Sequence, residues 1–298
     1  MLIPPYLKLG DKVAIISVAR KLSKADVQNS IDALESNGFV PKVSETVGAE
    51  HNIFSGNDEF RLAELQGFLN DPEIKAIWLA RGGYGTIRIL DKVDWTAFKA
   101  NPKWLIGFSD ITNLLAKVND LGVASIHGPM PKTIGYDFEE DVSANLLFQY
   151  LKGVEPKYQW KQSEACNIGS VKAEVVGGNL ATLSHLYPSL STDFFDHKML
   201  FIEEIDEYLY AIDRMLRGMK ISGRLDKLKG IIVGDFSGIK DNEDPFGENL
   251  QQIVKKVFSD LDIPIAFGFR AGHESINWPL VFGKEYELTY LNETWELK

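Results

Sequence analysis

The first half of the chain is organised around one stretch, Trp104-Leu105-Ile106-Gly107-Phe108-Ser109-Asp110-Ile111-Thr112. This stretch is apolar up to Gly107, turns sharply there and restarts as a helix. A serine at a tight strand-to-helix turn points its hydroxyl outward, and the amide of Asp110 faces the same space at the positive end of the new helix. The motif is G-x-S-x-I rather than G-x-S-x-G, so two interpretations stand. Ser109 is either a nucleophile or the N-cap of the helix.

Outward from this turn, strand and helix patterns alternate along residues 1–156. Strands are predicted over 12–18, 39–44, 76–80, 104–107 and 124–127, and helices after Ser23, over 58–70, from Thr86 and over 142–151. The alternation predicts an α/β domain, an open parallel sheet with helices on both faces in the flavodoxin-like manner. Functional loops are expected at the carboxyl ends of the strands.

The pattern breaks near 152–156, and the segment up to Gly169 is polar and irregular, which predicts an inter-domain linker. Strands are predicted beyond it over 171–176, 199–203, 230–234, 264–268 and 281–290, and helices over 179–186, 208–220 and 249–258. We therefore expect a second domain over residues 157–298, of the α+β class.

Composition restricts the classes of function. Among 298 residues, 45% are hydrophobic and 25% are charged, as in an ordinary globular protein, and the net charge of −10 argues against nucleic acid or an anionic membrane as partner. Cys166 is the only cysteine, so no intrachain disulfide is possible. The N-terminus lacks a basic flank with an apolar run, and no eighteen apolar residues run together. We expect a cytoplasmic protein with a small-molecule partner.

A serine nucleophile requires a base, and five histidines are available. His51 and His197 lie in polar, surface-like contexts, and His185 faces sideways on a predicted helix. His127 ends the strand after the Ser109 turn, where it could line a pocket. His273 lies in a loop that follows an apolar strand, which is a usual place for a site, although an isolated loop histidine is more often only solvated.

A carboxylate is needed to orient the base, and Glu203 closes the apolar run over 199–202. Glu204, Asp206 and Glu207 follow it. The same acidic run also fits a solvated turn that caps the next helix. A divalent-metal site is a weaker alternative, because no histidine at ligand spacing accompanies the run.

An oxyanion formed during acyl transfer requires two amide donors. The Asp110 amide is one candidate, and the loop Arg81-Gly82-Gly83-Tyr84-Gly85 is the source expected for the other, because glycines after a strand let backbone amides approach a ligand. The loop lacks the lysine of a G-x-x-x-x-G-K-[ST] motif and does not match G-x-G-x-x-G, which argues against a standard nucleotide loop.

Seven blocks occur in one order along the chain. They are Leu79-Ala80-Arg81-Gly82-Gly83-Tyr84-Gly85, Gly107-Phe108-Ser109-Asp110-Ile111-Thr112, Ile126-His127-Gly128-Pro129, Gly177-Gly178-Asn179-Leu180, Leu200-Phe201-Ile202-Glu203-Glu204, Ile212-Asp213-Arg214-Met215-Leu216 and Gly272-His273. Together they resemble the L,D-carboxypeptidase family of serine peptidases, of the muramoyltetrapeptide carboxypeptidase and microcin C immunity type. The resemblance implies a Ser109, Glu203 and His273 triad, with Gly83 (or Gly82) and the Asp110 amide as oxyanion hole.

The resemblance also implies a substrate, a murein tetrapeptide that loses its terminal D-alanine. Six residues are assigned to substrate binding on this basis: Arg81, Tyr84, His127, Arg214, Arg270 and Trp278. The arginines are candidates for holding the free carboxylate of the substrate. The resemblance implies no metal or organic cofactor. It does imply a homodimer. The first strand departs from the family pattern, because it ends in Ser17-Val18-Ala19-Arg20 rather than in a Ser-Pro or Ala-Pro turn.

Three other functions remain open at this point. An immunity-type amidase would cleave peptidyl or aminoacyl adenylates, with Trp278 stacked on the base. A ligand-binding module would use the same scaffold without chemistry. An esterase of the α/β-hydrolase type has the same order of serine, acid and histidine, but the second glycine of its nucleophile turn is missing here.

Overall fold

We describe residues 1–162 and 169–298 from a computed structural model. Their strands form two sheets, one of six strands and one of seven. The chain divides into two compact units, and each is described by itself. The first unit comprises Met1–Pro156 and Trp278–Val281, and the second comprises Lys157–Asn277 and Phe282–Lys298. Cys166 and part of the predicted linker lie outside the described residues.

The first unit is built on a sheet with the strand order β11-β5-β4-β3-β1-β2. Its strands are β1 (Lys12–Ile16), β2 (Val40–Val43), β3 (Ile74–Leu79), β4 (Trp104–Gly107), β5 (Ser125–His127) and β11 (Leu280–Phe282). The pairs that join β2, β1, β3, β4 and β5 are all parallel. The order β2-β1-β3-β4-β5 is that of flavodoxin-like sheets. The predicted fold class of this half is confirmed.

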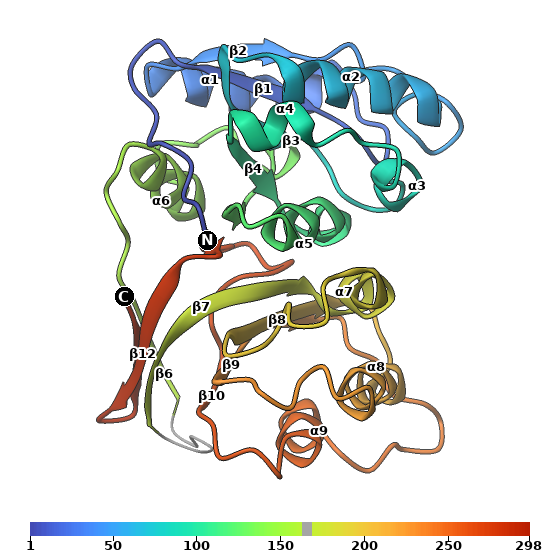
Figure 1. Ribbon diagram of the computed structural model, residues 1–298, viewed down its shortest axis with the longest axis vertical. Helices are drawn as coiled ribbons and strands as arrows, with labels where there is room; N and C mark the ends of the chain where they lie inside the picture. Colours follow the sequence, from blue (N-terminus) through green and yellow to red (C-terminus); the bar gives the residue numbers. More distant parts are fainter. Residues whose placement is uncertain (163–168) are drawn as a thin grey trace. The chain divides into compact units, whose positions relative to one another are not determined.

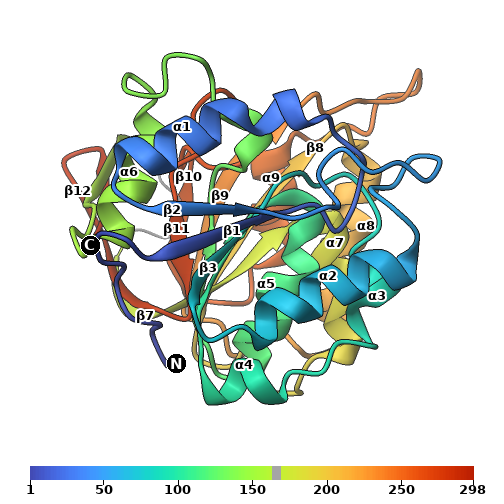
Figure 2. The same cartoon turned by 90° about the horizontal axis from the view of Figure 1, so that it is seen from above.

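Helices cover both faces of the first sheet, and Figure 2 shows α1 and α6 on one face with α2 and α5 on the other. The α-helices are α1 (Gln28–Ser36), α2 (Asp58–Asn70), α3 (Ile87–Leu90), α4 (Thr96–Ala100), α5 (Thr112–Asp120) and α6 (Val142–Leu151), with short 3₁₀ turns η1 (Lys24–Val27), η2 (Ser109–Ile111) and η3 (Pro131–Thr133). The predicted capping box is confirmed, because the Ser23 and Asp26 side chains each accept from the other's backbone amide.

The strand that carries Ser109 is firmly anchored. Trp104, at the start of β4, is fully buried, its indole N–H donates to the Pro5 carbonyl over 3.0 Å, and its ring packs edge-on against Tyr150. Burying a large apolar side chain stabilises a fold by roughly 1.5–3 kcal/mol. The turn after β4 therefore rests on a rigid support.

The second unit is built on a mixed sheet with the order β10-β9-β8-β7-β12-β13-β6 (Figure 1). Its strands are β6 (Tyr158–Lys161), β7 (Ser170–Asn179), β8 (Met199–Ile205), β9 (Gly230–Ser237), β10 (Ile265–Phe267), β12 (Glu285–Leu291) and β13 (Thr294–Leu297). Strands β7 to β10 are parallel, and the pairs of β12 with β7, β13 with β12 and β6 with β13 are antiparallel. The helices are α7 (Leu180–Leu186), α8 (Leu209–Ile221) and α9 (Leu250–Val257), with the 3₁₀ turn η4 (Tyr187–Ser189).

Two predicted segments were wrong in part. The predicted linker contains strand β6, whose buried Tyr158 and Trp160 alternate with the exposed Gln159 and Lys161, and the polar half of the alternation concealed the strand. The strands predicted over 281–290 are present as β11 and β12, separated at Gly283 with a φ of +84°, but β11 joins the first sheet and not the sheet of the second domain.

Candidate functional site

The strand order of the first unit places a ligand-binding position at the carboxyl ends of β1 and β3. In open parallel sheets ligands bind where the strand order reverses, and here β1 has β2 on one side and β3 on the other. The loop Ser17–Arg20 follows β1, the glycine loop 81–85 follows β3, and the Ser109 turn follows the neighbouring β4. The three loops singled out in the sequence therefore follow the carboxyl ends of adjacent parallel strands.

Ser109 has a strained backbone. Its φ of +62° lies in the left-handed region that non-glycine residues rarely adopt, whereas Phe108 before it is extended, with φ −152° and ψ −171°. Such strain persists only where the surroundings enforce it, and it clusters at functional sites. In the described part of the chain, the starts of η2 and α5 receive no side-chain capping hydrogen bond. The N-cap interpretation of Ser109 is therefore wrong.

The glycine loop approaches the serine closely. A Cβ atom on Gly82 would lie 2.9 Å from Ser109 Cβ, 3.1 Å from its Oγ and 3.3 Å from the Asp110 amide nitrogen. Gly83, with a φ of +102°, abuts the Arg20 side chain instead. Only glycine fits at position 82, so the loop backbone lies directly against the Ser109 hydroxyl.

The carboxylate of Asp110 ties the Ser109 turn to the glycine loop. Its Oδ2 accepts the Thr86 amide at 2.9 Å, and the Asn113 side chain donates to the Asp110 carbonyl at 2.9 Å. Burial raises the pKa of Asp110, while the hydrogen bonds from Thr86 act in the opposite direction. The side chain of Asp110 therefore has a structural role, because it is buried and hydrogen-bonded to Thr86.

In the second unit, Glu203 and His273 form a hydrogen-bonded pair. Glu203 lies on β8 and is fully buried, and His273 lies in the loop after β10. His273 Nδ1 is 2.8 Å from Glu203 Oε2. Burial lowers the pKa of His273, but the hydrogen bond and negative charge of Glu203 outweigh it, so the net shift is upward. A carboxylate at Nδ1 fixes the tautomer with its proton on Nδ1, in which Nε2 is the basic nitrogen.

Glu204, the next residue of the acidic run, has a structural role. Glu204 accepts from Asn179 Nδ2 at 2.9 Å and from the Ala181 amide at 2.6 Å, so its carboxylate caps the start of α7. Asp206 lies 3.4 Å from Lys240 Nζ. Within the described residues there is no cluster of three histidine, cysteine or acidic side chains that could hold a metal ion.

Asp235, near the end of β9, was missed in the sequence. Burial raises its pKa to about 6, and the charges of Glu274 and Glu203 add to the shift. A Cβ on Gly272 would lie 3.0 Å from Asp235 Cβ and 3.2 Å from Glu203 Oε2, so Asp235 neighbours the loop that carries His273. The signal was available, because a carboxylate that directly follows an apolar strand is also what singled out Glu203.

The six residues assigned to substrate binding have varied surroundings. Arg81 donates to the Lys21 carbonyl at 2.6 Å, Tyr84 is half-exposed beside Phe54, and His127 is fully buried against Phe108. Trp278 is partly buried and belongs to the first unit.

The other two residues of this group, Arg214 and Arg270, belong to the second unit and are exposed. The guanidinium of Arg214 lies 5.5 Å above the Tyr210 ring. The neighbouring Asp213 pairs with Arg217.

Two family models match the chain. One is described as the LD-carboxypeptidase N-terminal domain and covers residues 13–128, and the other as the LD-carboxypeptidase C-terminal domain and covers residues 172–288. The chain belongs to the LD-carboxypeptidase family. This assignment makes it a serine peptidase and confirms the resemblance seen in the sequence.

Relatives of this LD-carboxypeptidase cover nearly its whole length. A probable murein peptide carboxypeptidase of Bacillus subtilis is 32% identical and covers 98% of this chain and 92% of the relative. The crystal structure of muramoyltetrapeptide carboxypeptidase from Oxalobacter formigenes has a TM-score of 0.86 with 27% identity, covering 96% of this chain and 97% of the other. The microcin C7 self-immunity protein MccF of Escherichia coli is 24% identical over 96% of this chain and 93% of its own.

No helix in the described parts of this LD-carboxypeptidase is long and apolar enough to cross a membrane.

Proposed function

We propose that the chain releases the terminal D-alanine of murein tetrapeptide, with Ser109 as nucleophile, His273 as general base and Glu203 as the residue that orients the base. The buried Glu203–His273 pair at 2.8 Å carries this proposal, because a fully buried carboxylate on the Nδ1 side of a loop histidine is the arrangement that a serine nucleophile requires. The strained backbone of Ser109 supports it.

The reaction proceeds in two halves. His273 Nε2 takes the proton from Ser109 Oγ as this oxygen attacks the carbonyl carbon of the bond to D-alanine. The tetrahedral intermediate collapses, the carbon–nitrogen bond breaks, and His273 gives the proton to the departing amine. Water then attacks the acyl-enzyme with the same histidine as base, which releases the shortened peptide and restores Ser109.

The amides of Gly83 and Asp110 are proposed to stabilise the oxyanion. The close approach of Gly82 to Ser109 Oγ and to the Asp110 nitrogen supports this role for the Gly82–Gly83 segment. Gly82 remains the alternative donor to Gly83. The buried Asp110 carboxylate accepts a hydrogen bond from the Thr86 amide and so links the Ser109 turn to the residue that follows the glycine loop.

Selectivity for a terminal residue requires a cation for the free carboxylate of the substrate. Arg81, Arg214 and Arg270 are the proposed candidates. Of these, Arg81 has one hydrogen bond committed to the Lys21 carbonyl, while Arg214 and Arg270 are exposed. Tyr84, His127 and Trp278 are the other residues proposed to bind the substrate.

Three further properties stay predictions. We propose a homodimer in the cytoplasm, and a reaction that requires no metal or organic cofactor. Dialysis against a chelator is therefore expected to leave the rate unchanged. A loss that added divalent cation restores would contradict the metal-free mechanism.

Product analysis tests the function directly. The protein is incubated in parallel with murein tripeptide, tetrapeptide, pentapeptide and an aminoacyl-adenylate analogue, and the products are followed by mass spectrometry, with Ser109→Ala as control. We expect D-alanine and tripeptide from the tetrapeptide alone. Cleavage of the adenylate analogue without cleavage of the tetrapeptide would favour an immunity-type amidase, and tetrapeptide cleavage by Ser109→Ala at the wild-type rate would contradict the mechanism.

A further inference from the structure

Arg61 is a buried cation close to the proposed oxyanion hole. It lies in the first turn of α2, its side chain is fully buried, and its guanidinium stacks 4.9 Å from the Phe54 ring centre. A buried charge destabilises a fold unless hydrogen bonds and an opposite charge compensate it. The hydrogen-bond partners of Arg61 therefore indicate the role of its side chain.

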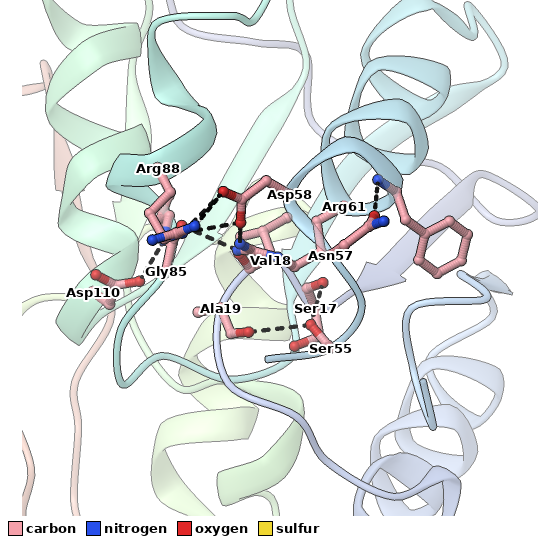
Figure 3. Close-up of polar contacts among 12 residues, drawn as sticks. Ser17, Val18, Ala19, Ser55, Asn57, Asp58, Arg61, Gly85, Arg88 and Asp110 are labelled. Atoms are coloured by element: carbon pink, nitrogen blue, oxygen red, sulfur yellow. Dashed lines mark hydrogen bonds and ion pairs between the residues drawn. The ribbon is translucent and has the colours of Figure 1, made fainter. Parts of the chain in front are cut away.

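The partners of Arg61 are the two loops at the strand-order reversal of the first sheet. Its Nη1 donates to the Gly85 carbonyl at 3.0 Å and to the Val18 carbonyl, and its Nη2 pairs with Asp58 (Figure 3). Asp58 also pairs with Arg88 at 2.7 Å, from the helix that follows the glycine loop. One guanidinium thus joins the loop after β1 to the loop after β3.

The glycine loop is held at both ends. Gly82 lies against Ser109, and its carbonyl accepts the Arg20 amide at 3.4 Å. At the other end, Gly85 has a φ of +141°, and a Cβ there would lie 2.9 Å from Arg61 Nη1. The neighbouring Thr86 amide donates to Asp110.

The Ser17–Arg20 loop, which departs from the family pattern, takes part in the same arrangement. Ser55 Oγ donates to the Ser17 carbonyl at 2.9 Å, and the Ser55 amide donates to the Ala19 carbonyl at 3.1 Å (Figure 3). This loop carries no proline, so hydrogen bonds hold its conformation, one within the loop from Ser17 Oγ to the Arg20 carbonyl at 2.9 Å and others from outside it. Arg61 supplies one of them at Val18.

We propose that Arg61 is a positioning residue for the oxyanion hole, which it maintains by holding the Gly85 and Val18 carbonyls and hence the Gly82–Gly83 segment beside Ser109. The inference rests on the proposed function, because an oxyanion hole matters only for acyl transfer. Arg61 touches neither Ser109 nor the reacting atoms. Its contribution is to the placement of an amide that acts in the transition state, so its loss should lower kcat while KM changes little.

Lys103, which lies just before β4, provides a matched control, because it is a second buried cation and contacts the carboxyl-terminal end of α2. Its Nζ donates at 2.9 Å to the carbonyl of Phe68, in the last turn of α2, and at 2.5 Å to the carbonyl of Asp71, just after the helix. Lys103→Met therefore removes a buried charge and two carbonyl contacts without touching the glycine loop. Arg61→Met removes the same kind of group at the end that faces the site.

The experiment compares Arg61→Met, Arg61→Lys and Lys103→Met with wild type by two readouts. One is kcat and KM for D-alanine release per folded enzyme, and the other is the rate at which a fluorophosphonate, whose adduct mimics the tetrahedral oxyanion, labels Ser109. For Arg61→Met we expect both kcat and labelling to fall about 10- to 100-fold with KM within about threefold. Arg61→Lys should be intermediate, and Lys103→Met should be near wild type in both.

Unchanged kcat and labelling in Arg61→Met would overturn the inference, as would equal losses in Lys103→Met. If Arg61→Met does not fold, Arg61→Lys decides by the same criteria. A wild-type protein that labels at Ser109 but releases no D-alanine would refute the proposed substrate, and the labelling ratios would still test Arg61. A wild-type protein that does neither would overturn the oxyanion hole and the inference together.

Discussion

The carboxyl ends of β4 and β8 supply different kinds of chemical group by different means. At the end of β4, the backbone conformation positions the Ser109 hydroxyl, because Ser109 has a left-handed φ and the glycine loop packs against this hydroxyl. At the end of β8, a buried side chain positions the base, because Glu203 is fully buried and its Oε2 lies 2.8 Å from His273 Nδ1. Apart from loss of the Ser109 hydroxyl itself, mutations at the first site should therefore act through shape, and mutations at the second through charge.

The largest effect is expected for Ser109→Ala. Without the hydroxyl no acyl-enzyme forms, and kcat should fall by about 10³-fold or more. The thermal unfolding midpoint should stay close to that of wild type, because the backbone strain at this position is retained. Ser36→Ala, an exposed serine at the end of α1, is the control and should leave kcat unchanged. Comparable losses in both variants would remove Ser109 from the mechanism.

Glu203→Gln and Glu204→Gln distinguish the proposed catalytic role of one buried carboxylate from the structural role of its neighbour. Glu203→Gln should lower kcat by about 10²- to 10⁴-fold, because the charge that stabilises the protonated histidine is lost. Glu203 raises the pKa of His273, so its removal should shift the acidic limb of the pH–rate profile to lower pH.

Glu204→Gln should instead reduce stability by about 1–3 kcal/mol, through the lost cap of α7, with the pH–rate profile nearly unchanged. Urea unfolding and pH–rate profiles measure both variants. The assignment of roles would be reversed if Glu204→Gln, and not Glu203→Gln, moved the acidic limb.

Gly82→Ala tests the role of shape at the end of β4. The added methyl group would lie 2.9 Å from Ser109 Cβ, so the turn must shift, and we expect kcat to fall about 10- to 100-fold. Gly67→Ala, in the exposed middle of α2 with no neighbour within 4 Å, is the control. It should stabilise the fold by about 0.5–1 kcal/mol with unchanged kcat. Equal kinetics in the two variants would show that the approach of the glycine loop is irrelevant to catalysis.

The smallest effect concerns the pH dependence of stability. Burial lowers the pKa of Lys103 to about 8, whereas the unfolded chain titrates near its ordinary value. The unfolded state therefore binds more protons between these two pKa values, and the contribution of Lys103 to the free energy of unfolding should rise with pH by at most about 3 kcal/mol. Urea unfolding of wild type and Lys103→Met at pH 7 and pH 10 measures it. A rise of equal size in the variant would refute the assignment.

Much of the first unit could be predicted from its sequence, because its signals are local. The helices over 58–70 and 142–151 and the strand over 104–107 have the predicted bounds, since apolar spacing and caps define them within a few residues. The parallel sheet with helices on both faces followed from the alternation of strands and helices. The strands β6 and β11 did not follow, because each is short and its pairing depends on residues far away in the chain.

The candidate site could be predicted only where a residue type and a strand end coincide. Ser109, Glu203 and His273 each follow an apolar run, and the structure bonds the last two to each other. The triad as a whole and the substrate-binding residues stay predictions. Arg61 gave no signal, because in the sequence of a helix an arginine that is fully buried looks the same as one that is exposed. Its role depends on the carbonyls of two loops, which no sequence pattern encodes.

Ser109 is proposed to be the nucleophile, and the Glu203–His273 pair is proposed to activate it. The most direct measurement is the rate of fluorophosphonate labelling, with the adduct located by peptide mass spectrometry, in wild type and in His273→Ala. We predict a single adduct on Ser109, formed at least about 100-fold more slowly in His273→Ala. An adduct on another residue, or labelling of Ser109 at the same rate in both proteins, would contradict the account.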